Sequence, residues 1–344
     1  MIELKKDRLT FSFPEVHPEA KLEIEFQRTL RIPDDGDEYP LPPGLGGFPL
    51  CHVDDYADNV PEAWSEHGGV FLPMFQSEAM WINFMERQIA NRRSSYPFAI
   101  RIATGKTNAI DGRSWTERLT RGPQNYVVAP TQPWLDGYCV KKGVIRQFVA
   151  MPLGSGYTAE EQISGEAKYG GVQIAVHPMK GDVFERRFPV GKSRAPVFED
   201  CCYMVAPDSK YESIDMGLAP GGQMRQEVYD DPFDLEDWDL DHSSRCFVHI
   251  SNSLVWREIT GTAPPTVPPT ASEYTNAGLP WFDYYSDGPS AIEGTGFLKK
   301  LKSIVDIGKE KGDVPLPENK SVNPKSVVVI KKKRAIDQVR EGQF

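Results

Sequence analysis

The strongest constraint on the fold is the stretch Val144–Gly165, in which an apolar run passes through a glycine-rich turn into a short helical segment. Lys141–Gly143 separates this run from the apolar residues Tyr138–Val140. A glycine at the end of such a turn reaches positive φ without steric cost, so the pattern predicts a β-hairpin. Pro152 has no N–H to donate to a sheet, and we expect the second strand to end there or to lie at an edge.

The turn that follows the hairpin contains Ser155 between two glycines. Thr158 and Glu161 have capping-box spacing, and Gly165 is placed to end a helix of about two turns. A phosphate-binding loop would need a Gly-Lys-Ser/Thr ending, and a hydrolase nucleophile would need Gly-x-Ser-x-Gly; neither pattern is present. We therefore interpret the turn as a tight connection between strand and helix.

Short strands are expected along most of the chain. Lys21–Phe26 alternates strictly, and apolar runs recur at Val70–Phe75, Val172–His177 and Phe184–Val190. The chain has 29 glycines and 29 prolines, which favour strands and turns over a helical bundle. We predict an α+β, β-dominated fold of antiparallel sheets packed as a sandwich.

Two helical features are expected to accompany the sheets. Ser77–Arg93 is predicted to be the one main covering helix, because Trp81, Met85 and Ile89 recur at helical spacing. A C-terminal helical extension is expected at Phe297–Lys309, with lysines on its polar side.

Three segments are expected along the chain: an N-terminal strand segment (1–40), a main β-rich body (41–261) with a possible sub-boundary near 180–196, and a C-terminal part (262–344). The last part opens with a proline-rich connector and ends in a basic tail. Residues 297–344 carry twelve cations and six carboxylates, a net charge of +6, so the remainder of this −10 chain carries −16. The cluster Lys331–Arg334 is interpreted as a solvated tail.

The cysteines and the hydropathy of the chain indicate the cellular compartment in which we expect the protein. The five cysteines include no C-x-x-C pair, and the adjacent Cys201 and Cys202 are expected on a strand. The N-terminus has no apolar signal-peptide region, and no apolar run reaches membrane-spanning length. We expect a cytoplasmic protein that does not insert into membranes.

The distribution of charged residues argues against both a metal site and a nucleic-acid partner. Residues 227–241 hold eight carboxylates and no cation, but EF-hand spacing is absent, so a solvated acidic loop is expected. His52 and Asp54 form too small a ligand set to predict a metal, and no cofactor is expected. The acidic balance argues against a dedicated nucleic-acid binder, because phosphate contacts supply most of that affinity.

Aromatic and polar side chains next to turns are the candidate binding residues. The aromatic-rich segment 279–285 is interpreted as core or as a contact patch. The candidate binding residues are Trp134, Asp136, Arg146, Ser155, Tyr157, Trp281, Tyr284 and Tyr285.

Several long motifs resemble one protein family. LPPGLG (41–46), GGVFLPM (68–74) and IRQFVAMPLGSGYTAEEQ (145–162) look like an uncharacterised family of soluble proteins from bacteria and filamentous fungi. Some fungal members carry a ubiquitin-like segment before the matching region. The resemblance implies a self-contained, mostly β body and assigns no reaction, cofactor or catalytic residue.

Two functions of different class follow from these patterns. The acidic body, basic tail and aromatic patch favour a non-enzymatic binding or assembly protein, acting as a homo-oligomer or with a protein partner. The alternative is a hydrolase or metal-dependent enzyme whose site forms only in the fold. Its candidate residues are His52, Asp54, Asp136, Ser155, His177 and His249.

Overall fold

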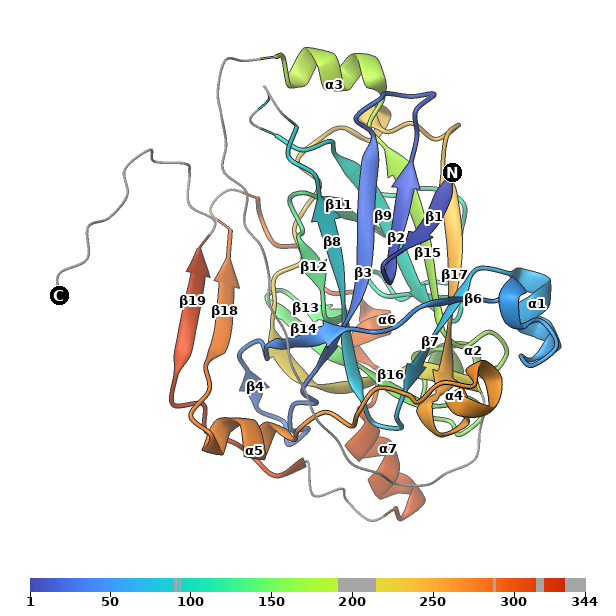
Figure 1. The fold of residues 1–344 in the computed structure, drawn as a ribbon. Coiled ribbons are helices and arrows are strands. Elements are labelled where there is room, and N and C mark those ends of the chain that lie inside the picture. Colours follow the sequence, from blue (N-terminus) through green and yellow to red (C-terminus); the bar gives the residue numbers. More distant parts are fainter. Residues whose placement is uncertain (90–91, 93, 191–214, 287–288, 314–318, 332–344) are drawn as a thin grey trace, which may run out of the picture.

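The computed structural model describes residues 1–89, 92, 94–190, 215–286, 289–313 and 319–331. Within these residues, seventeen strands form one continuous sheet, beside a two-stranded ribbon and seven short helices (Figure 1). The strands are β1 (Ile2–Lys5), β2 (Arg8–Ser12), β3 (Lys21–Thr29), β4 (Glu38–Tyr39), β5 (Gly44–Gly47), β6 (Cys51–His52), β7 (Val70–Met74), β8 (Ala79–Glu86), β9 (Phe98–Thr104), β10 (Thr107–Asn108), β11 (Val127–Ala129), β12 (Trp134–Leu135), β13 (Gly137–Lys141), β14 (Val144–Pro152), β15 (Val172–Pro178), β16 (Asp215–Arg225), β17 (Ser244–Asn252), β18 (Trp281–Tyr285) and β19 (Val327–Lys331). The helices are α1 (Glu62–His67), α2 (Ala159–Ser164), α3 (Gly181–Arg187), α4 (Ser253–Thr260), α5 (Ala271–Asn276), α6 (Gly296–Lys299) and α7 (Ile304–Lys311), with 3-10 turns η1 (Asp54–Tyr56) and η2 (Leu235–Asp237).

The main sheet follows one antiparallel path, β1-β2-β3-β8-β14-β16-β17-β15-β9-β11. The short strands β4 and β7 join its sides in parallel, against β16 and β17. Figure 1 shows β2 and β3 in front of β9 and β15, so the path folds over on itself. The predicted β-dominated, sandwich-like α+β fold is confirmed.

One large apolar core fills the space between the two halves of the sheet. In β3, Leu22, Ile24 and Phe26 are fully buried, while the residues between them face outward. Phe13, just after β2, meets Phe98 of β9 with ring centroids 6.1 Å apart. Burying each such side chain contributes about 1.5–3 kcal/mol.

The prediction of a main covering helix at 77–93 is wrong. Residues Ala79–Glu86 form β8, which pairs with β3 along its whole length. Met80, Ile82 and Phe84 are buried and alternate with half-buried residues, which is a period of two. The same apolar residues also matched helical spacing, and the open edge of β3 provided backbone partners that favoured a strand. Within the described chain, no helix is longer than the eight residues of α4 and α7.

The predicted central hairpin and capped helix are confirmed. β13 and β14 pair around Lys141–Gly143, with Gly143 at φ +74°. Thr158 accepts from the Glu161 backbone N–H, and the Glu161 carboxylate accepts in return from the Thr158 backbone, forming a capping box on α2. Gly165 ends the helix in the left-handed conformation.

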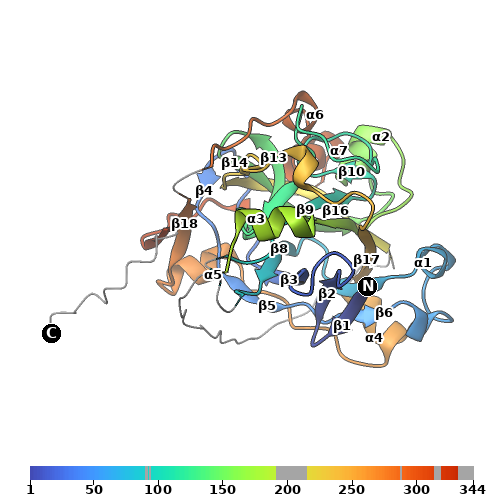
Figure 2. The same ribbon diagram turned by 90° about the horizontal axis from the view of Figure 1, so that it is seen from above.

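Other helical predictions are partly wrong. The helix expected over Phe297–Lys309 is divided into α6 and α7, because Ser303 caps a new helix start in a second capping box. The run Phe184–Val190, expected to be a strand, belongs mostly to α3, which Figure 2 shows lying across one end of the sheet. The predicted strand at 201–205, the sub-boundary beyond residue 190 and the basic cluster beyond Lys331 lie outside the described residues.

The acidic segment 227–241 is not the solvated loop that its composition predicted. Asp231 is 3% exposed and accepts from Tyr126 and from the Trp238 indole, the latter at 2.9 Å. Asp237 lies 2.6 Å from an Arg187 guanidinium nitrogen. Because these carboxylates find donors within the fold, part of the segment's negative charge is used internally.

Candidate functional site

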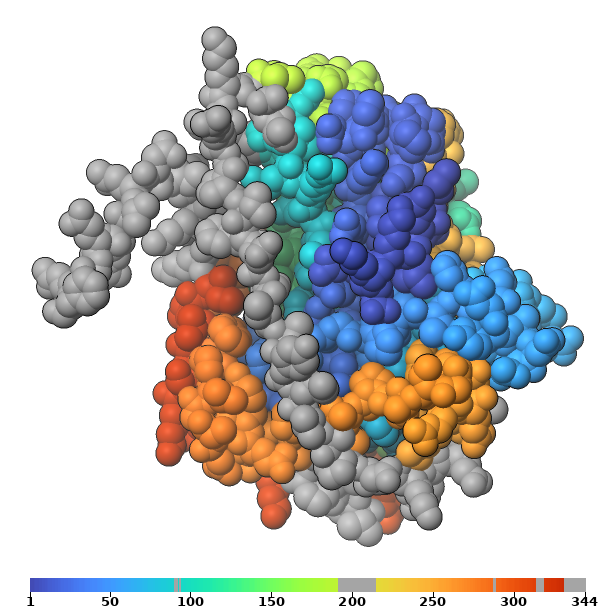
Figure 3. Space-filling model, viewed as in Figure 1, coloured from blue at the N-terminus to red at the C-terminus, as the bar shows by residue number. Residues whose placement is uncertain are grey.

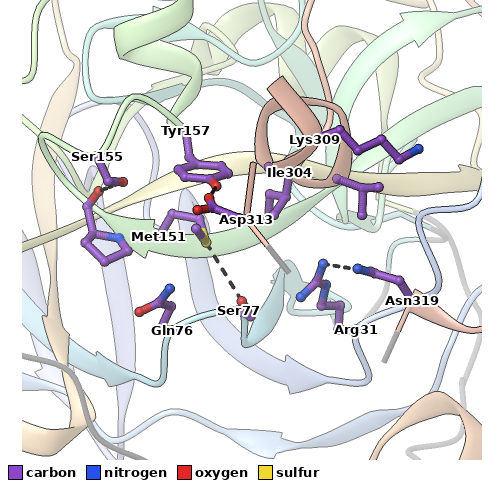
Figure 4. Close-up of a pocket in the computed structure, with 13 residues that line it drawn as sticks. Arg31, Gln76, Ser77, Met151, Ser155, Tyr157, Ile304, Lys309, Asp313 and Asn319 are labelled. Carbon is purple, nitrogen blue, oxygen red and sulfur yellow. Dashed lines mark hydrogen bonds between the residues drawn. The ribbon is translucent and has the colours of Figure 1, made fainter. Parts of the chain in front are cut away.

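The best-defined cavity is a pocket of about 280 Å³ between the end of β14, the following turn and α7 (Figure 4). Its lining combines an apolar floor with a polar rim. The described residues that line it are Arg31, Gln76, Ser77, Met151, Pro152, Ser155, Tyr157, Ile304, Val305, Gly308, Lys309, Asp313 and Asn319. Of the eight predicted binding residues, the fold brings Ser155 and Tyr157 together here.

The turn that carries Ser155 is held by hydrogen bonds from its own helix. The Gly156 N–H donates to the Glu161 carboxylate at 2.7 Å, and the Ser155 hydroxyl donates to the Pro152 carbonyl. A carboxylate thus already occupies the amide group that a phosphate would use. This geometry agrees with the interpretation of the turn as a structural connection.

The C-terminal part of α7 is tied to the same turn. The Tyr157 hydroxyl donates to the Asp313 carboxylate, and the Lys311 ammonium donates to the Ser155 carbonyl. Lys311 also lies 4.4 Å from the centroid of the Tyr157 ring. Burial, followed by the bond to Asp313, raises the pKa of Tyr157 to about 12, so the phenol is protonated at neutral pH and acts as a donor.

The opposite rim is the connection between β7 and β8. Ser77 has a φ of +69°, which is an uncommon conformation for a residue other than glycine. The buried Glu78 carboxylate accepts from the Phe75 N–H at 2.9 Å and pairs with Arg28 at 2.7 Å. This ion pair fixes the connection and holds the backbone of Ser77 in its strained position.

The pocket supplies cations and hydroxyls but no nucleophile paired with a base. Arg31 donates to the Asn319 side chain at 2.9 Å, and Lys309 adds a second positive charge. None of its described lining residues is a histidine, and its carboxylate is bound to Tyr157. The arrangement could bind a small polar molecule, and it does not form the triad that a serine hydrolase uses.

Trp134 and Tyr284 form a second grouping, an aromatic cluster on the outer side of β8 and β12. Their ring centroids are 4.7 Å apart, and Trp81 lies 6.0 Å from Trp134. Asp136 is fully buried nearby, where its carboxylate accepts from the Gln226 amide at 2.6 Å. Burial raises the pKa of Asp136 to about 7, so this carboxyl group is partly protonated at neutral pH.

Of the three remaining predicted binding residues, two have structural contacts and one is exposed. Arg146 donates to the Gly221 carbonyl at 3.1 Å and lies 3.7 Å from the Asp34 carboxylate. Trp281 is fully buried and donates to the Thr275 hydroxyl at 3.2 Å. Tyr285, at the end of β18, is 43% exposed.

The histidines considered for a catalytic or metal site lie apart from the pocket. His249 stacks on Trp64 at 4.8 Å, and burial lowers its pKa to about 4. His177 is buried beside Arg101, and burial lowers its pKa to about 4 as well. His52 is exposed on β6. Among the described residues, no group of three or more His, Cys, Asp or Glu side chains is placed to hold a metal ion.

The ribbon of β18 and β19 is a feature that the sequence analysis missed. The two strands pair in parallel, from Trp281 opposite Val327 to Tyr285 opposite Lys331. The four aliphatic residues of β19 are all exposed: Val327 by 40%, Val328 by 46%, Val329 by 50% and Ile330 by 41%. Figure 3 shows this strand at the outer edge of the molecule. The run of four β-branched residues, next to the basic cluster Lys331–Arg334, was the signal available in the sequence.

Comparisons with known proteins returned no match to a family model, a curated protein or a solved structure. None of the described helices has the length and apolar character needed to cross a membrane.

Proposed function

We propose that the chain is a non-enzymatic assembly protein whose copies associate through the edge of β19. The observation that carries this proposal is the four consecutive exposed aliphatic side chains on that strand. Among the described residues, β19 pairs with β18 alone, so its other edge presents backbone donors and acceptors. A long, apolar, unpaired edge is a template for another strand.

A second copy of β19 is the partner that fits best. Successive side chains of a strand point to opposite faces, so Val327 and Val329 lie on one face, and Val328 and Ile330 on the other. A strand that joins this edge must therefore be apolar on both faces. β19 has this property itself, and two antiparallel copies would form a four-stranded, two-fold symmetric sheet.

Electrostatics set the conditions for this association. Lys325 and Lys331 flank the aliphatic run, and each whole chain carries a net charge of −10. Two copies therefore repel each other, both locally and overall. Salt screens this repulsion and strengthens apolar contact, so we expect association to increase with ionic strength. Docking of the basic tail on an acidic body would show the opposite dependence.

Light scattering over a range of protein and salt concentrations tests the proposal. We expect a dimer for the full chain and a monomer for Val329→Lys, which places a charge at the proposed junction. Leu240→Lys is the matched control, because Leu240 is 53% exposed and lies outside the ribbon. It should leave the dimer unchanged. A monomer at all concentrations, or a dimer that Val329→Lys does not weaken, would refute the proposal.

A further inference from the structure

The outer face of β9, β15 and β17 gathers positive charge on an acidic chain. The strand register places Arg101, Ala175 and Arg245 in one row across the three strands. The next row on the same face contains Ala103, Gln173 and Phe247. Ala103, Ala175 and Gln173 are buried between the cations and the ring.

Cations and aromatic rings alternate along this face. Arg101 lies 4.6 Å from the centroid of Trp115, and Arg245 lies 5.3 Å from that of Phe247. Lys106 lies 4.0 Å from the ring of Tyr169 and donates to its hydroxyl at 2.7 Å. We name the surface formed by Arg101, Lys106, Trp115, Lys168, Tyr169, Arg245 and Phe247 the basic aromatic face.

Arg101 is the most unusual member of the basic aromatic face. Its side chain is 2% exposed, and its Nη2 lies 3.4 Å from Nε2 of the neutral His177 ring. Within the described chain, Arg101 Nε and Nη1 and the Trp115 indole N–H have no hydrogen-bond partner. A buried guanidinium without a carboxylate is costly for a fold to retain. The unused donors therefore point to an anionic group that comes from outside the chain.

Carboxylates compensate for little of this charge. Glu117 lies 3.3 Å from Arg245 and is 77% exposed, and its charge also acts on Arg101 from a longer distance. Asp239 contributes at the far end, beside His177. Lys106 and Lys168 both lie around Tyr169 and lower its pKa, first through the hydrogen bond from Lys106. The end of the face around Tyr169 is thus the more positive one.

We propose that the basic aromatic face binds single-stranded nucleic acid. Lysine and arginine side chains attract the phosphates, and an exposed base stacks on an aromatic ring such as that of Tyr169. Arg101 and the Trp115 N–H supply donors for one further phosphate once the indole ring turns aside. An acidic peptide would use the cations and would leave the rings without a role. A duplex keeps its bases stacked internally, so it would lack the aromatic contacts. The overall negative charge keeps binding weak and dependent on low salt.

Fluorescence anisotropy with labelled oligo(dT) and oligo(rU) of about 12 nucleotides tests this proposal, with duplex DNA and poly-glutamate as competitors. Tyr169→Ala should weaken binding by about 5- to 150-fold, the loss expected for one stacked base. Lys106→Gln should lower the slope of log affinity against log salt by about 0.7. Lys142→Gln, an equal charge change on the hairpin turn, should have no such effect, and circular dichroism checks that each variant is folded.

Trp115→Phe gives a second readout. It retains an aromatic ring and removes the indole N–H, so we expect weaker binding and the loss of any tryptophan fluorescence change that the oligonucleotide produces in the unaltered protein. Equal affinity of Tyr169→Ala and Lys142→Gln would refute the proposal. Poly-glutamate that displaces the oligonucleotide at equal charge concentration would also refute it and would identify the face as a docking site for acidic proteins.

Discussion

β14 and β19 are both apolar strands rich in branched side chains, yet the fold treats them in opposite ways. β14 has β13 and β16 beside it and β8 at one end, and six of its nine residues are buried hydrophobics. β19 has β18 as its described neighbour, and its four aliphatic residues are 40–50% exposed. Similar local sequences thus occupy a well-covered strand and a largely exposed one among the strands that the structure describes.

The difference shows that the burial of an apolar strand depends on which strands and side chains lie beside it. The polar residues of β14 find partners inside the fold: the Gln147 amide accepts from the Ile32 N–H at 3.0 Å and donates to the Leu30 carbonyl at 2.8 Å. β19 has no comparable tertiary support among the described contacts. An exposed apolar edge promotes association, so the same β-propensity stabilises the fold in one strand and favours self-assembly in the other.

Among the changes that should still leave a fold to measure, the largest effect is expected from a steric clash in the hairpin. A Cβ atom at Gly137 would lie 1.9 Å from the Arg146 carbonyl oxygen, and the strand pair would have to separate to admit it. We expect Gly137→Ala to lower the free energy of unfolding by about 3 kcal/mol or more. Gly296→Ala is the control, because its Cβ would meet nothing within 4 Å. Urea denaturation measures both, and equal stability of the two variants would contradict close packing in β13–β14.

The buried ion pair beside β14 should have the next largest effect. Glu78 is 3% exposed, and its backbone carbonyl accepts from the Ala150 N–H at 2.9 Å. Arg28→Met would leave this carboxylate buried without its cation, at a cost of about 3–5 kcal/mol. Adding Glu78→Gln should recover part of the loss, because no uncompensated charge remains. A double variant as unstable as the sum of the two single changes would argue against a coupled pair.

The carboxyl group of Asp136 predicts a pH dependence of smaller size. Burial raises its pKa from 3.8 to about 7 in the folded protein, so the native state binds its proton more tightly than the unfolded state. The stabilisation is fully present below pH 3.8 and is lost as pH rises through about 7, by roughly 1–3 kcal/mol.

Asp136→Asn should remove this contribution. Urea unfolding of both proteins at each pH gives their free energies of unfolding, and the difference between the two reports the contribution of Asp136 alone. Asp215, whose pKa burial raises to about 6, titrates equally in both proteins. Parallel stability profiles between pH 4 and 8 would show that Asp136 is ionised throughout that range.

The sequence predicted features that depend on local chemistry. The hairpin turn at Gly143, the capping box at Thr158 and the strand at Lys21–Phe26 all follow from residues within a few positions of one another. β8 was mistaken for a helix because its apolar spacing fits both periods, and pairing with a strand at least fifty residues away decided between them.

The candidate site was less predictable for the same reason. Ser155 and Tyr157 were identified because they flank an evident turn, whereas Arg31 and Ser77 reach the pocket only through tertiary packing. The exposure of β19 depends on which surfaces remain uncovered after the rest of the chain has packed, and neither hydropathy nor propensity reports that directly.

The smallest effect on stability is expected from Val329→Lys, and this variant tests the comparison of β14 with β19 most directly. Val329→Lys changes a side chain that is 50% exposed, so we expect the free energy of unfolding of the monomer to change by no more than about 0.5 kcal/mol. Val149→Lys, at a fully buried position of β14, should prevent stable folding. Urea denaturation at a protein concentration low enough to give monomers makes the measurement. If Val329→Lys destabilised the monomer by more than about 1 kcal/mol, β19 would belong to the cooperative core, and its exposed residues would no longer be evidence for a partner.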